Sequence, residues 1–265
     1  MNEYLEAIIL GIIQGLTEFL PVSSSGHLEL AKWLLGDSGN ASESFLMTVV
    51  LHFGTALATV WVFRDYIWDI LKKIGQPEGR KYILWIIISM IPAVFVGIGL
   101  DEQITALFDR QIILVSCMLL LTGIVLIISD HWKTSVQPLG TISALVIGIA
   151  QAIAILPGVS RSGATIATGV FLGIDRKSVA QFSFLMVIPL IFGKIAKDFA
   201  GGEIDMSSDK ALPMLLGFAF SFFVGIAACQ WMVKIVQNAK LRYFGYYCLV
   251  VGTLAILLRL FVLKG

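Results

Sequence analysis

The sequence Gly11-Ile-Ile-Gln-Gly-Leu-Thr-Glu-Phe-Leu-Pro-Val-Ser-Ser-Ser-Gly26 has a related copy later in this chain. It returns 137 residues later as Gly148-Ile-Ala-Gln-Ala-Ile-Ala-Ile-Leu-Pro-Gly-Val-Ser-Arg-Ser-Gly163, identical at seven of sixteen positions. Further matches follow, between 44–54 and 183–193 at seven of eleven positions and between 95–98 and 223–226. The chain therefore consists of two related halves, which we place at 1–139 and 140–265.

The composition indicates a membrane protein. Of the 265 residues, 57% are hydrophobic and 14% are charged, and the mean hydropathy is +0.88. These values exclude an ordinary soluble domain. The net charge of +1 gives no reason to expect a nucleic-acid partner. Apolar runs long enough to span a bilayer recur at about 45–63, 83–100, 111–129, 181–199, 212–233 and 243–263.

Two further apolar segments, 5–35 and 141–174, are each interrupted by proline and by a Ser/Gly cluster. Backbone that is not helical survives at membrane depth only where protein or a wet cavity surrounds it. We therefore expect each segment to form a re-entrant helix hairpin. Three spans follow each hairpin, so the halves must have opposite orientations. The expected fold is an all-α polytopic membrane protein, an inverted-topology repeat with six transmembrane helices and two re-entrant helix hairpins in a single membrane domain.

The basic residues predict the orientation of this arrangement. One side would hold Arg64, Lys72, Lys73, Arg80, Lys81, Lys133, Arg176, Lys177, Lys234, Lys240 and Arg242. By the positive-inside rule this side is cytoplasmic. Both termini and the mouth of the first hairpin then face the outer side of the membrane.

The first copy of the repeat carries reactive residue types. Gln14 and Glu18 are four residues apart and share one face of a helix. Pro21 is expected to end that helix, the Ser-Ser-Ser-Gly run at 23–26 to form a polar turn, and His27 to open the next helix. A helix start presents free backbone N–H groups that suit an anion.

The second copy repeats this arrangement and adds a cation. Pro157 and Gly158 break the chain, the run at 160–163 forms a turn around Arg161, and Thr165 lies in the first turn of the next helix. Arginine offers a forked set of donors that matches phosphate geometry, and its burial in a bilayer is costly. Two such turns with one Arg predict a cradle for a phosphate or diphosphate.

The two copies differ where chemistry would occur. The aligned pairs are Glu18 and Ile155, Ser24 and Arg161, and His27 and Ala164. A hydroxyl needs an adjacent base to become a nucleophile, and an imidazole can act as that base or attack phosphorus itself. Glu18 could orient His27, hold a divalent cation with Gln14, or act on water. Arg161 would stabilise charge on the transferring phosphoryl oxygens.

Structural interpretations compete with these roles. Ser and Gly are common where membrane helices pack closely. Glu18 and Arg161 could form only a buried ion pair. His52, inside the apolar run 45–63, is expected to be a hydrogen-bonded polar residue without a chemical role.

Three motifs carry a resemblance to a known family. Gln14-Gly-Leu-Thr-Glu18, Leu20-Pro-Val-Ser-Ser-Ser-Gly-His27 and Pro157-Gly-Val-Ser-Arg-Ser-Gly-Ala-Thr165 resemble those of the integral-membrane undecaprenyl-diphosphate phosphatases of bacteria, also called bacitracin-resistance proteins of the BacA type. The resemblance covers essentially the whole chain. The first motif of that family begins with Glu or Gln, and here it begins with Gln14, which weakens a role for this residue as a proton carrier.

The resemblance implies hydrolysis of the C55 polyprenyl diphosphate to its monophosphate, which recycles the lipid carrier of cell-wall synthesis and confers bacitracin resistance. It also implies a divalent cation (Mg²⁺ or Ca²⁺), location in the bacterial inner (plasma) membrane, and a site open to the outer side. Expected partners are the lipid substrate, membrane lipids and, as one option, a second copy in a homodimer.

Position by position, the resemblance assigns roles to the repeated motifs. The catalytic candidates are Glu18, Ser24, His27 and Arg161. The phosphate contacts are Ser23, Ser25, Gly26, Ser160, Ser162, Gly163 and Thr165, with Gln14 and Glu18 as metal ligands. The spacing leaves open whether Ser24 or His27 attacks phosphorus, and we favour Ser24 with His27 as its base.

A transporter or flippase of a polyprenyl phosphate or another anion is the main alternative, because inverted repeats with broken helices are a transporter architecture. The set of Glu18, Ser24, His27 and Arg161 exceeds what anion binding requires. An intramembrane serine protease is a weaker alternative, since it leaves Arg161 and the second Ser/Gly turn without a role.

Overall fold

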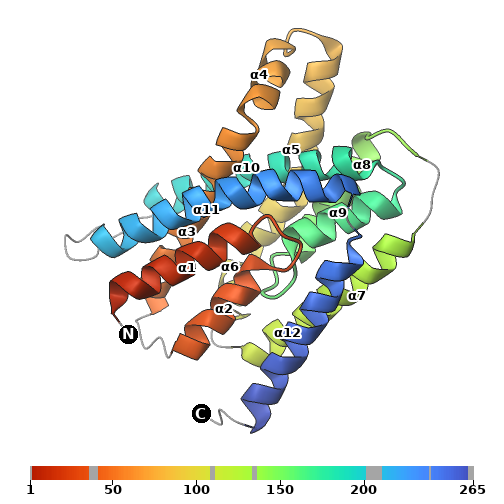
Figure 1. Cartoon of the computed structure of the whole chain (residues 1–265). Coiled ribbons are helices and arrows are strands. Elements are labelled where there is room, and N and C mark those ends of the chain that lie inside the picture. The colour runs from red at the N-terminus through yellow and green to blue at the C-terminus, as the bar shows by residue number, and fades with distance from the viewer. Residues whose placement is uncertain are drawn as a thin grey trace.

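A computed structural model describes residues 2–35, 41–107, 111–132, 136–200, 211–238 and 240–261 of the chain. Within these ranges the regular elements are helices (Figure 1). They are α1 (Glu3–Thr17), α2 (Ser24–Leu35), α3 (Ala41–Val62), α4 (Arg64–Lys72), α5 (Pro77–Gly99), α6 (Asp101–Leu107), α7 (Ile112–His131), α8 (Thr141–Ile153), α9 (Arg161–Phe171), α10 (Arg176–Ala200), α11 (Ala211–Asn238) and α12 (Arg242–Phe261).

The predicted apolar runs are helices of spanning length. Five helices, α5, α7, α10, α11 and α12, are long and apolar enough to cross a membrane. The part of α3 from Leu46 to Val62 passes the same test only together with α4, from which it is bent by 65°, and this pair makes a sixth candidate span. These findings confirm an all-helical protein with five or six membrane-spanning helices. The helices α4 and α6 were not predicted, because each lies in a connection between apolar runs.

The two interrupted segments form pairs of short helices, but the helices begin earlier than predicted. α2 begins at Ser24, where His27 was expected to open it, and α9 begins at Arg161. The predicted Ser/Gly turns are therefore the first helical turns. Thr165 consequently lies in the second turn of α9. The breaks themselves are 18–23 and 154–160, and each contains a residue with positive φ, Ser23 at 70° and Gly158 at 93°.

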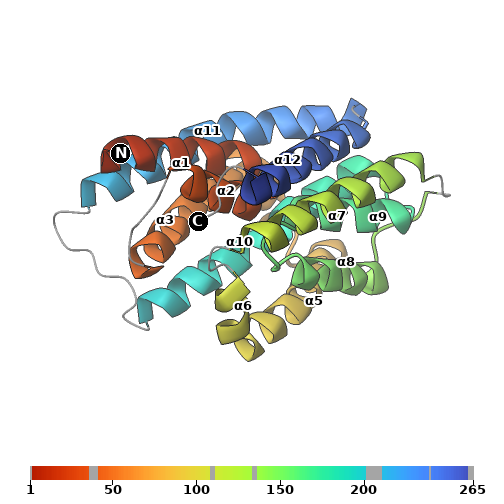
Figure 2. The same ribbon diagram turned by 90° about the horizontal axis from the view of Figure 1, so that it is seen from below.

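Small residues bring the helices close together. A Cβ atom on Gly11 of α1 would lie 2.6 Å from the carbonyl oxygen of Gly217 in α11, and one on Gly148 of α8 would lie 2.4 Å from that of Ser89 in α5. In membranes such small residues allow backbones to approach without a hydrophobic driving force. Figures 1 and 2 both show α1 running along α11.

The two breaks meet inside the bundle. A Cβ atom on Gly26 would lie 3.1 Å from Cα of Gly158, and the hydroxyl of Ser162 donates to the carbonyl of Leu20 at 3.1 Å. From this meeting point α2 packs toward the start of α7, where Leu30 joins a cluster with Ile112. α9 instead packs toward the end of α7, with Trp132 against Phe171 at 5.4 Å between ring centroids. α2 and α9 thus extend from the meeting point toward opposite ends of α7.

The largest buried cluster surrounds the start of α10, where Phe182, Phe184 and Met186 are fully enclosed. Phe19 from the first break and Ile147 from α8 belong to the same cluster. The core therefore anchors both interrupted segments.

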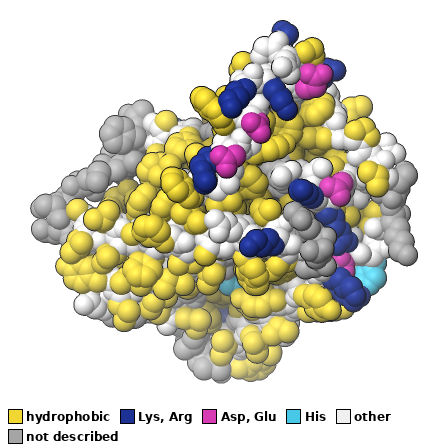
Figure 3. Space-filling view, turned by 45° about the horizontal axis from the view of Figure 1, so that its top comes forward, with side chains coloured by type: hydrophobic (Ala, Val, Ile, Leu, Met, Phe, Trp, Pro, Cys, Tyr) yellow, Lys and Arg dark blue, Asp and Glu magenta, His cyan; other side chains and the backbone are white. Residues whose placement is uncertain are grey.

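Lys and Arg side chains gather on the face toward which α4 projects (Figure 3). The described members of the predicted cytoplasmic set lie in or next to α4, at the starts of α5, α10 and α12, and near the end of α11. Lys133 lies outside the described residues. This distribution is consistent with the predicted orientation, which remains a prediction.

Candidate active site

The carboxylate of Glu18 is the centre of the site. Its Oε1 atom lies 2.7 Å from Nη2 of Arg161, and its Oε2 atom accepts hydrogen bonds from the hydroxyl of Ser24 at 2.7 Å and from the amide of Gln14 at 3.1 Å. Only 9% of the Glu18 side chain is exposed. One buried carboxylate thus joins a hydroxyl from the first hairpin to a guanidinium from the second.

Helix ends position these three side chains. Glu18 caps the end of α1, where its N–H donates to the carbonyl of Gln14 at 3.0 Å. Ser24 is the first residue of α2 and Arg161 the first residue of α9. The guanidinium is also fixed by a hydrogen bond from Nη1 to the carbonyl of Ser183 at 3.1 Å.

The first turns of α2 and α9 are built alike. The N–H of Gly26 donates to Oγ of Ser23 at 3.2 Å, and the N–H of Gly163 donates to Oγ of Ser160 at 3.0 Å. Each capping serine also lies near the serine two residues on, at 3.3 Å for Ser25 and 3.4 Å for the pair in α9. Ser23 and Ser160 therefore cap the helices, which is a structural use of residues predicted to bind phosphate.

Other predicted phosphate contacts are also engaged in the fold. The hydroxyl of Thr165 donates to the carbonyl of Arg161 at 2.8 Å and lies 2.6 Å from that of Ser183. Ser162 is buried and bonds across to the first break. Ser24, Ser25 and Arg161 are partly exposed, so these are the predicted residues that an anion can reach.

The ring nitrogens of His27 contact groups other than the hydroxyl of Ser24. Its Nδ1 atom is 2.8 Å from the carbonyl oxygen of Ser23, and its Nε2 atom is 2.9 Å from the hydroxyl of Tyr247 in α12. Both ring nitrogens are thus engaged, and the basic group beside Ser24 is Glu18 rather than the predicted His27.

Four residues of this neighbourhood were not predicted to belong to it. Nε2 of His52 lies 3.9 Å from Oε2 of Glu18, and Thr55 accepts from the amide of Gln14 at 3.4 Å. Ser183 and Tyr247 contact Arg161 and His27 as described above. One sequence feature pointed to His52. It aligns with Ile191 in the match between 44–54 and 183–193, so, like Glu18 and His27, it is a polar residue with an apolar counterpart in the other copy.

The oxygen atoms around Glu18 suit a cation that arrives with a phosphate ligand. Across the described ranges, no group of three His, Cys, Asp or Glu side chains converges. Oε1 of Gln14 is buried without a hydrogen-bond partner, one turn before Glu18. Mg²⁺ is usually held by one or two protein oxygens together with waters and substrate phosphates. Gln14 and Glu18 offer oxygen ligands of this kind, but it is the amide nitrogen of Gln14 that faces Glu18, so the amide has to turn over before both residues can ligate one cation.

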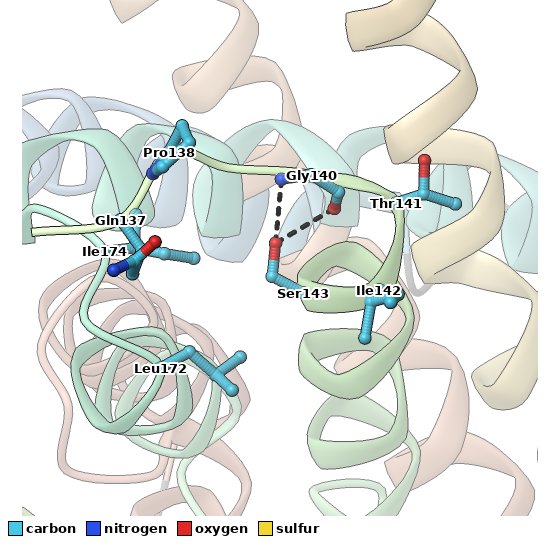
Figure 4. A pocket seen from close by; sticks show the side chains of 8 residues that line it. All are labelled: Gln137, Pro138, Gly140, Thr141, Ile142, Ser143, Leu172 and Ile174. Atoms are coloured by element: carbon cyan, nitrogen blue, oxygen red, sulfur yellow. Dashed lines mark hydrogen bonds between the residues drawn. The ribbon is translucent and has the colours of Figure 1, made fainter.

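A separate cavity of about 430 Å³ opens between the segment that precedes α8, the first turn of α8 and the residues that follow α9 (Figure 4). The hydroxyl of Ser143 there accepts from the N–H of Gly140 at 2.8 Å and donates to its carbonyl at 2.9 Å. The lining residues are Gln137, Pro138, Gly140, Thr141, Ile142, Ser143, Leu172 and Ile174. None of the predicted site residues lines this cavity.

Comparison with known proteins identifies the family of the chain. A family model described as "Bacitracin resistance protein BacA" matches residues 7–254. The chain is 52% identical over 255 residues to the undecaprenyl-diphosphatase of Christiangramia forsetii, covering 95% of this chain and 97% of the relative. Identity to the undecaprenyl-diphosphatase of Bacteroides thetaiotaomicron is 43% over 264 residues, with 97% and 99% covered. For that of Rhodopirellula baltica it is 37% over 267 residues, with 98% and 100% covered. A family match over most of the chain, together with relatives this similar, shows that the chain belongs to the bacitracin resistance protein BacA family.

Proposed function

We propose that this chain hydrolyses undecaprenyl diphosphate to undecaprenyl phosphate and inorganic phosphate, recycling the lipid carrier of cell-wall synthesis and conferring bacitracin resistance. The substrate class comes from the names of the relatives. The observation that carries the proposal is the Glu18 carboxylate, which holds Ser24 and Arg161 at 2.7 Å each. A flippase would use Arg161 but has no need of a hydroxyl held by a carboxylate, so hydrolysis is favoured.

The reaction begins at Ser24. Its Oγ attacks the terminal phosphorus as its proton passes to Oε2 of Glu18. The Oγ–P bond forms, the bond from phosphorus to the bridging oxygen breaks, and undecaprenyl phosphate leaves with that electron pair. Arg161 stabilises the charge on the transferring phosphoryl oxygens. Water then hydrolyses the phosphoserine, Ser24 recovers its proton from Glu18, and His27 receives the proton of the water.

The first turns of α2 and α9 hold the diphosphate. First-turn N–H groups have no acceptor inside their own helix, and a helix start favours an anion. Ser25 adds a partly exposed hydroxyl. Ser23, Ser160, Ser162 and Thr165 support these turns from within through the hydrogen bonds described above.

The site would be completed by a divalent cation, Mg²⁺ or Ca²⁺. Gln14 and Glu18 would hold it together with phosphate oxygens of the substrate, and it would neutralise charge on the diphosphate.

The site opens to the outer side of the plasma membrane, within an inverted repeat of halves 1–139 and 140–265. Similar helix contacts support the repeat, because Gly11 meets Gly217 and Gly148 meets Ser89. Gly11 aligns with Gly148, and Ser89 and Gly217 are separated by the same 128 positions as the matching segments 95–98 and 223–226. The gathering of basic residues on one face supports the orientation.

Phosphate release from undecaprenyl diphosphate by the purified protein in detergent with Mg²⁺ tests the proposal. The wild-type chain releases phosphate, and Ser24→Ala reduces turnover at least about 100-fold, as expected for a lost nucleophile. Ser178→Ala is the matched control, since Ser178 is exposed and bonds only to Asp175 at the start of α10. Absence of release by the folded wild-type chain would contradict the function, and normal turnover by Ser24→Ala would contradict the site.

A further inference from the structure

His27 and Tyr247 are 220 positions apart in the chain, and their side chains are in direct contact. Their rings stack with an interplanar angle of 8° and 5.6 Å between centroids, while Nε2 and the tyrosine hydroxyl lie 2.9 Å apart. The pair joins α2 of the first half to α12 of the second, which lie next to each other in Figures 1 and 2.

The partner of Nδ1 determines what Nε2 can do. Nδ1 lies 2.8 Å from the carbonyl oxygen of Ser23, and a carbonyl only accepts, so Nδ1 carries a hydrogen. In the neutral ring Nε2 is then the acceptor, and the hydroxyl of Tyr247 donates to it. The single lone pair with which His27 can take up a proton therefore points at the hydroxyl of Tyr247.

Other contacts hold Tyr247 in this place. The next residue, Cys248, lies with its Sγ atom 3.9 Å from the carbonyl oxygen of Pro21 in the first break. Two residues earlier, a Cβ atom on Gly245 would lie 2.7 Å from the carbonyl oxygen of Gly123 in α7. α12 is thus packed tightly on α7 and against the first break. Tyr247 is still 45% exposed, so protein does not enclose its side chain.

We propose that Tyr247 relays the proton between the attacking water and His27. This role rests on the proposed hydrolysis and concerns its second step. The water oxygen bonds to phosphorus as the bond from phosphorus to Oγ of Ser24 breaks. One water proton passes to the Tyr247 oxygen while the tyrosine proton passes to Nε2 of His27. Ser24 recovers its own proton from Glu18, and the imidazolium later releases its proton to solvent.

A hydroxyl is suited to this position because it donates and accepts at once. Once His27 is protonated, the same oxygen accepts from Nε2–H, so the contact persists through the cycle. Replacing the phenol by a benzene ring keeps the stack and removes the hydroxyl, and with it both the hydrogen bond to Nε2 and the relay.

Tyr247→Phe in the full chain, with Tyr246→Phe as the matched control, tests the relay. Tyr246 is the adjacent tyrosine and is 49% exposed. Tyr247→Phe is expected to lower kcat about tenfold, the rate equivalent of one hydrogen bond, with KM unchanged. The double variant His27→Ala/Tyr247→Phe should be no slower than His27→Ala, because both changes interrupt one path. Unchanged kcat in Tyr247→Phe, or additive losses in the double variant, would overturn the proposal.

A second readout does not depend on turnover. Diethyl pyrocarbonate modifies the free nitrogen of neutral histidine, and peptide mass spectrometry resolves His27 from His131, whose Nδ1 bonds to the carbonyl of Ile127. Tyr247→Phe should speed modification of His27 several-fold and leave His131 unchanged. An unchanged His27 rate would contradict the hydrogen bond even if activity fell. A wild-type chain without phosphatase activity that still shows this difference would sink the proposed function and leave the bond in place.

Discussion

Oε1 of Glu18 and Nη2 of Arg161 lie 2.7 Å apart although 143 positions separate the residues in the chain. Glu18 ends the first helix of one half, and Arg161 begins the second short helix of the other. Their alignment partners, Ile155 and Ser24, cannot form this pair. The ion pair therefore depends on the differences between the two copies.

The first prediction concerns the stability of this pair. Arg161→Met should lower the free energy of unfolding by about 3–5 kcal/mol, because it leaves a buried carboxylate without its counter-charge. Glu18→Gln/Arg161→Met should recover part of that loss while remaining inactive. Thermal unfolding in detergent measures both. Equal stability of Arg161→Met and the wild-type chain would show that Glu18 is not buried as an ion pair.

The second prediction concerns helix packing. Gly11→Ala places a methyl group 2.6 Å from the carbonyl oxygen of Gly217, so it should destabilise by about 1–3 kcal/mol through overpacking. Gly97→Ala is the control, since nothing lies within 4 Å of the added atom. It should stabilise α5 by about 0.5–1 kcal/mol through helix propensity. Unfolding temperatures that move in the same direction for both variants would contradict the close approach of α1 and α11.

The third prediction concerns the divalent cation. Gln14→Glu adds a carboxylate beside Glu18 and should lower the Mg²⁺ concentration needed for half-maximal activity, whereas Gln14→Leu should raise it. Gln151→Leu alters the repeat counterpart in the other half and should leave the Mg²⁺ requirement unchanged. The Mg²⁺ requirement is measured by removing bound cations from the protein with a chelator and then following activity as Mg²⁺ is added back. A requirement unaffected by both Gln14 variants would place the cation elsewhere.

The fourth prediction concerns orientation. In a background with Cys117, Cys229 and Cys248 replaced by serine, Asn2→Cys should react with a membrane-impermeant maleimide from outside intact cells. Lys73→Cys, in the link between α4 and α5, should react only after permeabilisation. Labelling of both variants from outside would contradict the assignment of the basic face to the cytoplasm.

The long helices and the meeting of the two interrupted segments could be predicted from the sequence. Apolar runs of spanning length predicted the long helices because membrane burial demands them. The aligned repeats predicted a site shared by the two interruptions, and the ion pair of Glu18 and Arg161 was the structural alternative considered for that site. The interruption itself was less predictable. The start of α2 at Ser24 depends on the local hydrogen bond by which Ser23 caps the turn, and no periodicity reveals such a bond.

Residues outside the repeat motifs were harder to find. Tyr247 lies in a helix whose sequence reads as an ordinary span, and only packing against the first break brings it to His27. His52 also lies in an apolar run, and its position beside Glu18 depends on how α3 packs on α1. Such contacts are set by tertiary structure, so a single sequence shows the residue types but not their neighbours.

The most direct test of the account is to trap the covalent intermediate. Undecaprenyl diphosphate carrying ³²P in its terminal phosphate is mixed with the protein and quenched during a single turnover, and the labelled peptide is identified. Transient label is expected on Ser24 of the wild-type chain, with slower loss of label in His27→Ala and no label in Ser24→Ala. Label on His27, or hydrolysis without any labelled protein, would contradict attack by Ser24.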